Sequence, residues 1–193
     1  MTTRERPQMQ KWTTLKVLLT AIVAVLMLCF LSWEHFNGGV TSHHLLQQKS
    51  LPAISNWWSG IFLPALTWLL LSRTQKRLNR QASQGQPILK LQRQVILLWF
   101  LGMVLGALIA TTFENGFSPF LDNVPYIILV LSLLIPIYYA EFMLGFILAM
   151  TYTFGAILPT AFILVLAAIG FLSYRFIRTG IILLTTKLVK SRA

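Results

Sequence analysis

The second half of the chain is almost free of charge over a long stretch. From Val124 to Tyr174, Glu141 is the only acidic or basic residue. A helix needs about 20 apolar residues to cross a hydrocarbon core of about 30 Å. A water-facing surface cannot be built from such a stretch, because soluble domains carry about 25% charged residues. The stretch therefore predicts transmembrane helices.

The whole chain has the same character. It has 193 residues, of which 56% are hydrophobic and 11% are charged. A single membrane domain over residues 1–193 is the simplest prediction. The net charge of +11 comes from basic residues that flank apolar runs, as the positive-inside rule predicts. We therefore expect anionic lipids at the cytoplasmic face as the partner, and no nucleic acid. The lone Cys29 excludes an internal disulfide and a Cys-rich zinc site.

Three apolar runs and the block from Val124 to Tyr174 predict an all-α, polytopic transmembrane helix bundle. The block could hold two long spans or three short ones, and the charge asymmetry favours three, which gives six spans in all. The predicted spans are 13–33, 57–71, 94–113, 124–139, 142–157 and 160–174. With six spans both termini are cytoplasmic, and every Lys and Arg except Lys49 faces the cytoplasm. Residues 176–190 alternate apolar and basic groups at helical spacing, which predicts an amphipathic helix in the interface, and an irregular end of the last span stays open as the alternative. Compactness and charge asymmetry suggest a bacterial inner membrane.

Two residue spacings predict features of the helices, one a close helix contact and the other a basic helix face. Gly102 and Gly106 form a GxxxG pair, which lets another helix approach closely. A basic face is expected if the second helix continues beyond its apolar run, because four basic residues follow at positions i, i+3, i+4 and i+7. These residues are Arg73, Lys76, Arg77 and Arg80.

A polar constellation falls on the non-cytoplasmic side of this topology. Three histidines could bind Zn²⁺ or another divalent metal, and three carboxylates could act as catalytic groups. Neighbouring side chains would supply hydrogen bonds. The spacing matches no signature, so an ordinary polar loop and a pH-sensing role stay open. The candidate ligands are His35, His43 and His44, the candidate catalytic residues are Glu34, Glu114 and Asp122, and the supporting residues are Asn37 and Ser42.

Glu141 is a separate candidate. In the six-span topology it lies at the cytoplasmic boundary between two spans, where it needs no special role. If those two runs formed one longer helix, the carboxylate would be buried, and intramembrane carboxylates are functional candidates. Tyr138, Tyr139 and Tyr152 are candidate partners for it.

Three functions fit these features. The first is a metal-dependent hydrolase or transferase that acts on a lipid or lipid-linked substrate at the outer face. The second is a small-solute transport component, such as a membrane substrate-binding subunit. The third is a non-catalytic assembly or regulatory protein, and a homo- or hetero-oligomer is compatible with each. The sequence contains no P-loop and no dinucleotide-binding fingerprint.

Overall fold

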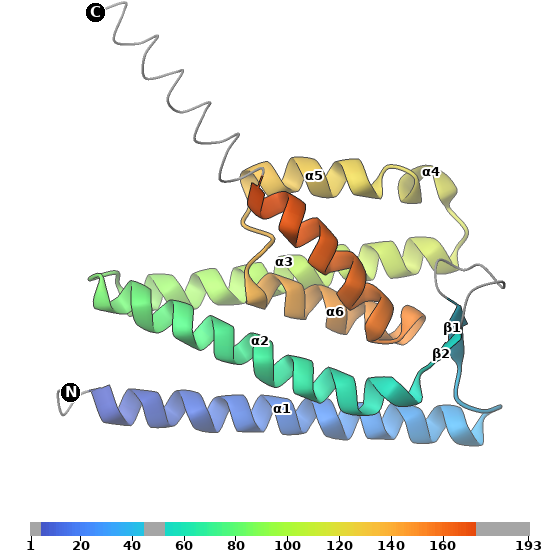
Figure 1. Cartoon of the computed structure of the whole chain (residues 1–193), viewed down its shortest axis with the longest axis horizontal. Coiled ribbons are helices and arrows are strands. Elements are labelled where there is room, and N and C mark those ends of the chain that lie inside the picture. The colour runs from blue at the N-terminus through green and yellow to red at the C-terminus, as the bar shows by residue number, and fades with distance from the viewer. Residues whose placement is uncertain (1–4, 45–52, 173–193) are drawn as a thin grey trace, which may run out of the picture.

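The protein is described by a computed structural model over residues 5–44 and 53–172, and nearly all of this part is helical. The described part has six longer helices, of which the first three run most of the distance between two ends of the molecule and the last three cover only part of it (Figure 1). A short helix and a two-stranded hairpin lie at one of these ends. The elements are α1 (Glu5–Phe36), β1 (Ser42–His44), β2 (Ala53–Ser55), α2 (Trp57–Ser83), α3 (Ile88–Glu114), α4 (Ser118–Leu121), α5 (Val124–Leu134), α6 (Ala140–Phe154) and an unlabelled helix, Ile157–Leu172.

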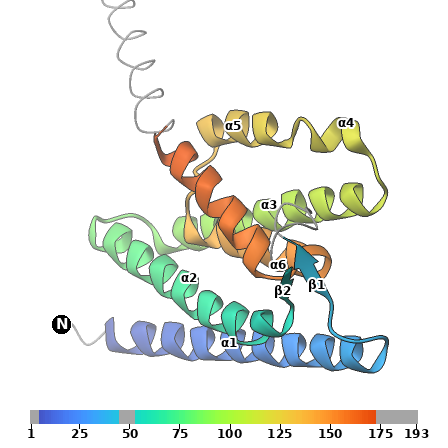
Figure 2. The same cartoon turned by 45° about the vertical axis from the view of Figure 1, so that its right-hand side comes forward.

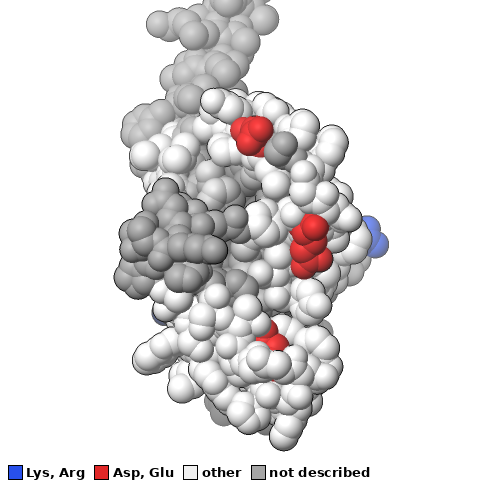
Figure 3. All heavy atoms as spheres, turned by 90° about the vertical axis from the view of Figure 1, so that its right-hand side faces the viewer, with Lys and Arg blue, Asp and Glu red and all other residues white. Residues whose placement is uncertain are grey.

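The two ends differ in charge. One end holds the start of α1 and the α2–α3 turn. We call it the basic end, because the basic part of α2 leads into that turn, with Arg73, Lys76, Arg77 and Arg80. We call the opposite end the acidic end. It holds the end of α1, the hairpin and the α3–α4–α5 connection, and acidic side chains mark its surface (Figure 3).

The acidic end is closed by the hairpin. β1 and β2 are antiparallel, with Ser42 opposite Ser55. The chain leaves α1 through Gly38 and Gly39, whose φ angles of 118° and 97° are positive. Only glycine adopts such angles without strain, so this pair allows the sharp exit. The hairpin was not expected from the sequence, which predicted a loop there.

The core is organised around α6. Eight consecutive residues at its start, 140–147, are buried, and α6 packs against α3 and α2 (Figure 2). Its closest approach is to α3 through glycines. A Cβ on Gly102 would lie 2.1 Å from the carbonyl oxygen of Phe142, and one on Gly145 would lie 2.0 Å from that of Trp99. The prediction that the GxxxG glycines serve close helix packing is confirmed.

Two helices are long and apolar enough to cross a membrane, namely 12–36 within α1 and the whole of α3. Only 11% and 33% of their most apolar segments are buried within the chain. The core helix of a soluble protein would be mostly buried, whereas here large side chains such as Val25 and Ile96 are exposed. The all-α class is confirmed. Six crossings stay a prediction, because the remaining apolar helices α5, α6 and Ile157–Leu172 are shorter.

Several helix boundaries differ from the predicted spans. α2 continues to Ser83 and α3 begins at Ile88, so the basic region between them is a helical hairpin. Arg, Lys and Gln are good helix formers, so polarity ends the apolar run without ending the helix. α5 stops at Leu134, just before Pro136, because proline lacks an N–H and disfavours helix in the preceding residue. The predicted amphipathic segment 176–190 lies outside the described residues.

Candidate functional site

A long groove lies between α1 and α3, and α2 and α6 complete its lining. Its volume is about 1030 Å³. Ligand pockets commonly have volumes of about 300–1,000 Å³, so the groove could take a large ligand. On α1 its lining extends from Trp12 to Phe30, which corresponds to about 27 Å at 1.5 Å per residue.

The groove is polar at one end and mostly apolar along its length. Its two charged lining residues in the described part of the chain, Lys16 and Glu141, both lie toward the basic end, where Lys16 contacts Ser72 and Glu141 pairs with Arg77 of α2. The amides of Gln75 and Gln92 lie at the same end. Leucine, isoleucine and valine side chains dominate the remaining walls, with Tyr152 toward the other end. This distribution matches a molecule with a polar head and a long apolar chain.

Lys16 is held in a defined place at this polar end. Its Nζ donates a hydrogen bond to Ser72 Oγ at 3.2 Å. The same ammonium lies 4.0 Å from the centroid of the Trp68 ring, a cation–π contact. Lys16 is half-buried, so it would meet an anionic group with part of its hydration already removed.

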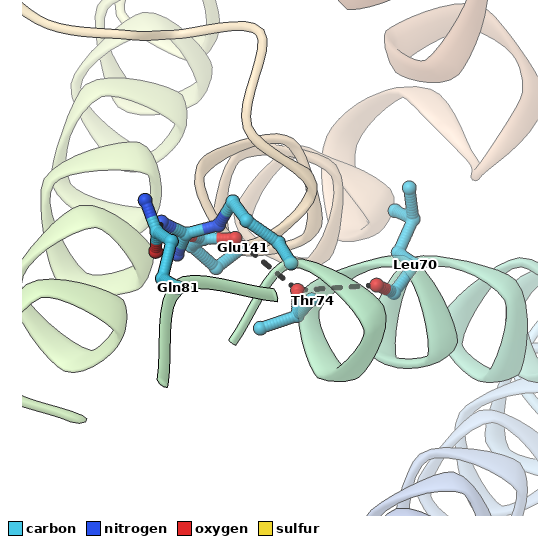
Figure 4. Close-up of polar contacts among 5 residues, drawn as sticks. Leu70, Thr74, Gln81 and Glu141 are labelled. Atoms are coloured by element: carbon cyan, nitrogen blue, oxygen red, sulfur yellow. Dashed lines mark hydrogen bonds and ion pairs between the residues drawn. The ribbon is translucent and has the colours of Figure 1, made fainter. Parts of the chain in front are cut away.

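The other charged residue of the groove, Glu141, is buried with 2% of its surface exposed. It forms an ion pair with Arg77 of α2, and Thr74 Oγ1 donates to its Oε2 at 3.2 Å (Figure 4). A buried charge is tolerated only when it is paired and hydrogen-bonded, and both conditions hold here. Glu141 is therefore buried although α5 and α6 are separate helices, a combination that neither sequence interpretation contained.

Arg77 is fixed by further contacts. Its Nη1 donates to Gln81 Oε1 at 3.1 Å, and its guanidinium lies 4.2 Å from the centroid of the Tyr139 ring. Its Nε is buried without a hydrogen-bond partner. Of the three tyrosines proposed as partners of Glu141, Tyr139 contacts Arg77 and Tyr152 lines the groove.

At the acidic end, Glu34 is buried and enclosed by hydrogen bonds. Thr41 Oγ1 donates to its Oε1 at 2.6 Å, and Asn56 Nδ2 donates to its Oε2 at 3.0 Å. Asn56 is 2% exposed, and its Oδ1 has no hydrogen-bond partner. The carboxylate thus ties the end of α1 to the hairpin and to the start of α2.

The other residues predicted for a metal or catalytic site contact different groups from those around Glu34. His35 is exposed beside the rings of Phe36 and Trp57. Glu114 is exposed and accepts a hydrogen bond from Thr153, and Asp122 is also exposed.

The remaining predicted site residues have local roles or undescribed side chains. Asn37 Nδ2 donates to the carbonyl of Trp33, and Ser42 pairs with Ser55. The side chains of His43 and His44 lie outside the described part of the structure. Within that part, no group of three His, Cys, Asp or Glu side chains could hold a metal. The zinc site stays a prediction.

Comparisons with protein-family models, with curated proteins and with solved structures find no match.

The polar end of the groove was not predicted from the sequence. The residues concerned are Lys16, Thr74, Gln75 and Gln92, which lie on three different helices. One signal was present, because Lys16 lies within the first predicted span. Its place beside the other three depends on helix packing.

Proposed function

We propose that this chain is an integral membrane protein that binds an anionic lipid, or a lipid-linked molecule, in the groove between α1 and α3. The head group would lie at the basic end and the apolar chain along the groove. The observation that carries this proposal is the distribution of polarity, with both charged lining residues at one end of a groove about 27 Å long.

Charge favours an anionic head group. The negative charge of Glu141 is offset by Arg77, so Lys16 is the uncompensated charge of the groove's described lining. Charge-assisted hydrogen bonds from an ammonium to a phosphate are about twice as strong as neutral ones. The amides of Gln75 and Gln92 would add neutral donors. A small polar solute is a poorer fit, because it would leave the apolar walls exposed.

We further propose that the six longer helices each cross the membrane, with the basic end in the cytoplasm of a bacterial cell. The alternating course of these helices and the charge difference between the two ends support this arrangement. A lipid could then enter the groove laterally, since the outward faces of α1 and α3 are apolar.

The test is lipid retention through purification in mild detergent. Leu18 and Leu19 are both exposed, but Leu19 lines the groove and Leu18 does not. We expect the parent protein and the matched control Leu18→Trp to keep near-stoichiometric anionic lipid, measured by extraction and mass spectrometry. Leu19→Trp should lose most of it, because an indole would occupy the groove. Equal retention in both variants would overturn the proposal.

A metal-dependent reaction on a lipid-linked substrate, carried out at the acidic end, is a second candidate. Its support is the pair of Glu34 and Asn56, where a buried carboxylate lies beside a buried, unpartnered amide oxygen. Carboxylate and amide oxygens are the usual protein ligands of hard metal cations such as Ca²⁺. Metal analysis without chelator tests it. Near-stoichiometric metal in the parent, lost in Glu34→Gln and in a variant with His35, His43 and His44 changed to alanine, is the expected result. Absence of metal from the parent would exclude it.

A further inference from the structure

A shallow, open hollow lies on the surface of α2, on a side that does not line the groove. It has a volume of about 340 Å³, and no residue of its lining is shared with the groove. We call it the basic hollow. Its lining consists of Arg73, Lys76, Arg77, Arg80 and Gln81.

The basic hollow gathers positive charge that the described protein does not neutralise. Its four cations are spaced at i, i+3, i+4 and i+7, so they repel one another along one helix face. Within the described residues the Arg77–Glu141 pair is the one ion pair, which leaves three of the four without an acidic partner. Arg73, Lys76 and Arg80 are exposed. An anion bound among them would remove this repulsion.

Arg77 gives the hollow a fixed donor. Glu141 and Gln81 hold two of its guanidinium nitrogens, and the Tyr139 ring packs against its plane. A donor whose orientation is fixed beforehand loses little entropy when it binds a ligand. Glu141 therefore acts as a positioning residue for Arg77, and it need not touch the ligand. A guanidinium held in this way suits the oxygens of a phosphate group.

The position of the hollow favours a lipid over a soluble phosphate. Trp68 and Leu69 are exposed apolar residues one to two turns before the hollow on the same helix. Tryptophan concentrates at the level of lipid head groups, and basic residues follow it on the cytoplasmic side. The hollow thus lies where the apolar face of α2 gives way to a basic one.

We propose that the basic hollow binds the phosphate head group of an anionic membrane lipid, as a site separate from the groove. This inference rests on the proposed membrane placement of the chain, and it does not require a lipid in the groove. It explains why four basic residues occupy one face of a helix that contains no acidic residue.

The test uses the full chain in mild detergent, titrated calorimetrically with dihexanoyl phosphatidylglycerol, dihexanoyl phosphatidylcholine and inorganic phosphate. The double variant Lys76→Gln/Arg80→Gln removes two cations of the hollow and leaves Arg77 in place. The matched control is Lys90→Gln/Arg93→Gln, which removes two exposed cations of α3 that do not line the hollow. Both variants lower the net charge equally.

We expect phosphatidylglycerol to bind the parent and the α3 control alike, and at least about tenfold more weakly to the hollow variant. Phosphatidylcholine and inorganic phosphate at equal concentration should bind much more weakly. Equal losses in both variants would mean general attraction by net charge. Equally tight binding of inorganic phosphate would identify a free-anion site. Either result would overturn the proposal.

The groove lipid is measured in the same samples, so the two proposals can fail separately. The hollow variant should keep the long-chain lipid that co-purifies with the groove. Leu19→Trp should lose that lipid while its titratable phosphatidylglycerol site remains. If Leu19→Trp abolished the titrated binding as well, the head group would belong to the groove and the separate site would be wrong.

Discussion

Arg77 and Glu141 are 64 residues apart in the chain and form an ion pair between α2 and α6. The pair lies between the groove and the basic hollow, since Glu141 lines the groove and Arg77 lines the hollow. It also lies at the start of α6, where residues 140–147 are all buried. This contact therefore contributes to the fold and sets the charge of both proposed sites.

Breaking the ion pair should destabilise the protein strongly. Arg77→Gln and Glu141→Gln each leave one buried charge without its partner, which costs about 3–5 kcal/mol in buried pairs. We expect about 3 kcal/mol, the lower value, because the Arg77 side chain is 17% exposed. The measurement is the midpoint of thermal unfolding in detergent.

The double variant Arg77→Gln/Glu141→Gln provides the control for that experiment. It should be more stable than the sum of the two single losses predicts, because neither charge is then left unpaired. Strict additivity of the two losses would show that the pair has no net coupling in the folded protein.

The α3–α6 interface should not tolerate a methyl group. In Gly145→Ala the new Cβ would meet the carbonyl oxygen of Trp99, and in Gly102→Ala that of Phe142. Backbone atoms cannot rotate away, so each change should cost at least about 1–3 kcal/mol and reduce the yield of folded protein. Gly60→Ala is the matched control, because its Cβ would meet only the flexible Leu31 Cδ1, at 2.9 Å. Comparable losses in all three variants would contradict the close packing of α3 on α6.

Lys16→Gln should change which lipid is retained more than how much is retained. The variant removes the uncompensated charge of the groove's described lining and leaves the apolar walls intact. We expect the anionic fraction of co-purified lipid to fall severalfold while total lipid stays near the parent value. An unchanged lipid profile would place the head group elsewhere. Lys90→Gln, which does not line the groove, is the control.

The proposed topology can be tested with cysteines, because Cys29 is the only native one. In a Cys29→Ala background, Gln84→Cys lies in the exposed α2–α3 turn and Asn115→Cys lies just after α3. A membrane-impermeant maleimide added to intact cells with a permeabilised outer membrane should label Asn115→Cys and leave Gln84→Cys unlabelled. Labelling of both positions, or of Gln84→Cys alone, would contradict the proposed orientation.

Much of the helical architecture followed from local patterns. Each long apolar run became a helix, because apolar residues at this density can satisfy backbone hydrogen bonds only internally. The pair of Gly102 and Gly106 predicted a close helix contact. The ends of helices were less well determined, as the continuation of α2 through Arg80 shows. Helical propensity and hydropathy change at different positions there.

The contacts of the polar residues could not be predicted from the sequence, since they join segments that are distant in the chain. Glu34 was predicted to be catalytic, and in the structure its two oxygens accept hydrogen bonds from Thr41 and Asn56. Glu141 was predicted to lie at a span boundary, and in the structure it is buried within the protein and paired with Arg77. Neither partner can be found from spacing along one helix.

By itself, the sequence determined that the chain forms apolar helices and that its positive charge gathers around their ends. Both properties depend on residues close together in the chain, through helical periodicity and through the cost of placing charge in an apolar medium. The groove, its polar end and the basic hollow were decided by the tertiary structure. Glycines on α3 and α6 let these two helices pack closely, whereas a groove remains between α1 and α3, and both features depend on how side chains from distant segments fit together.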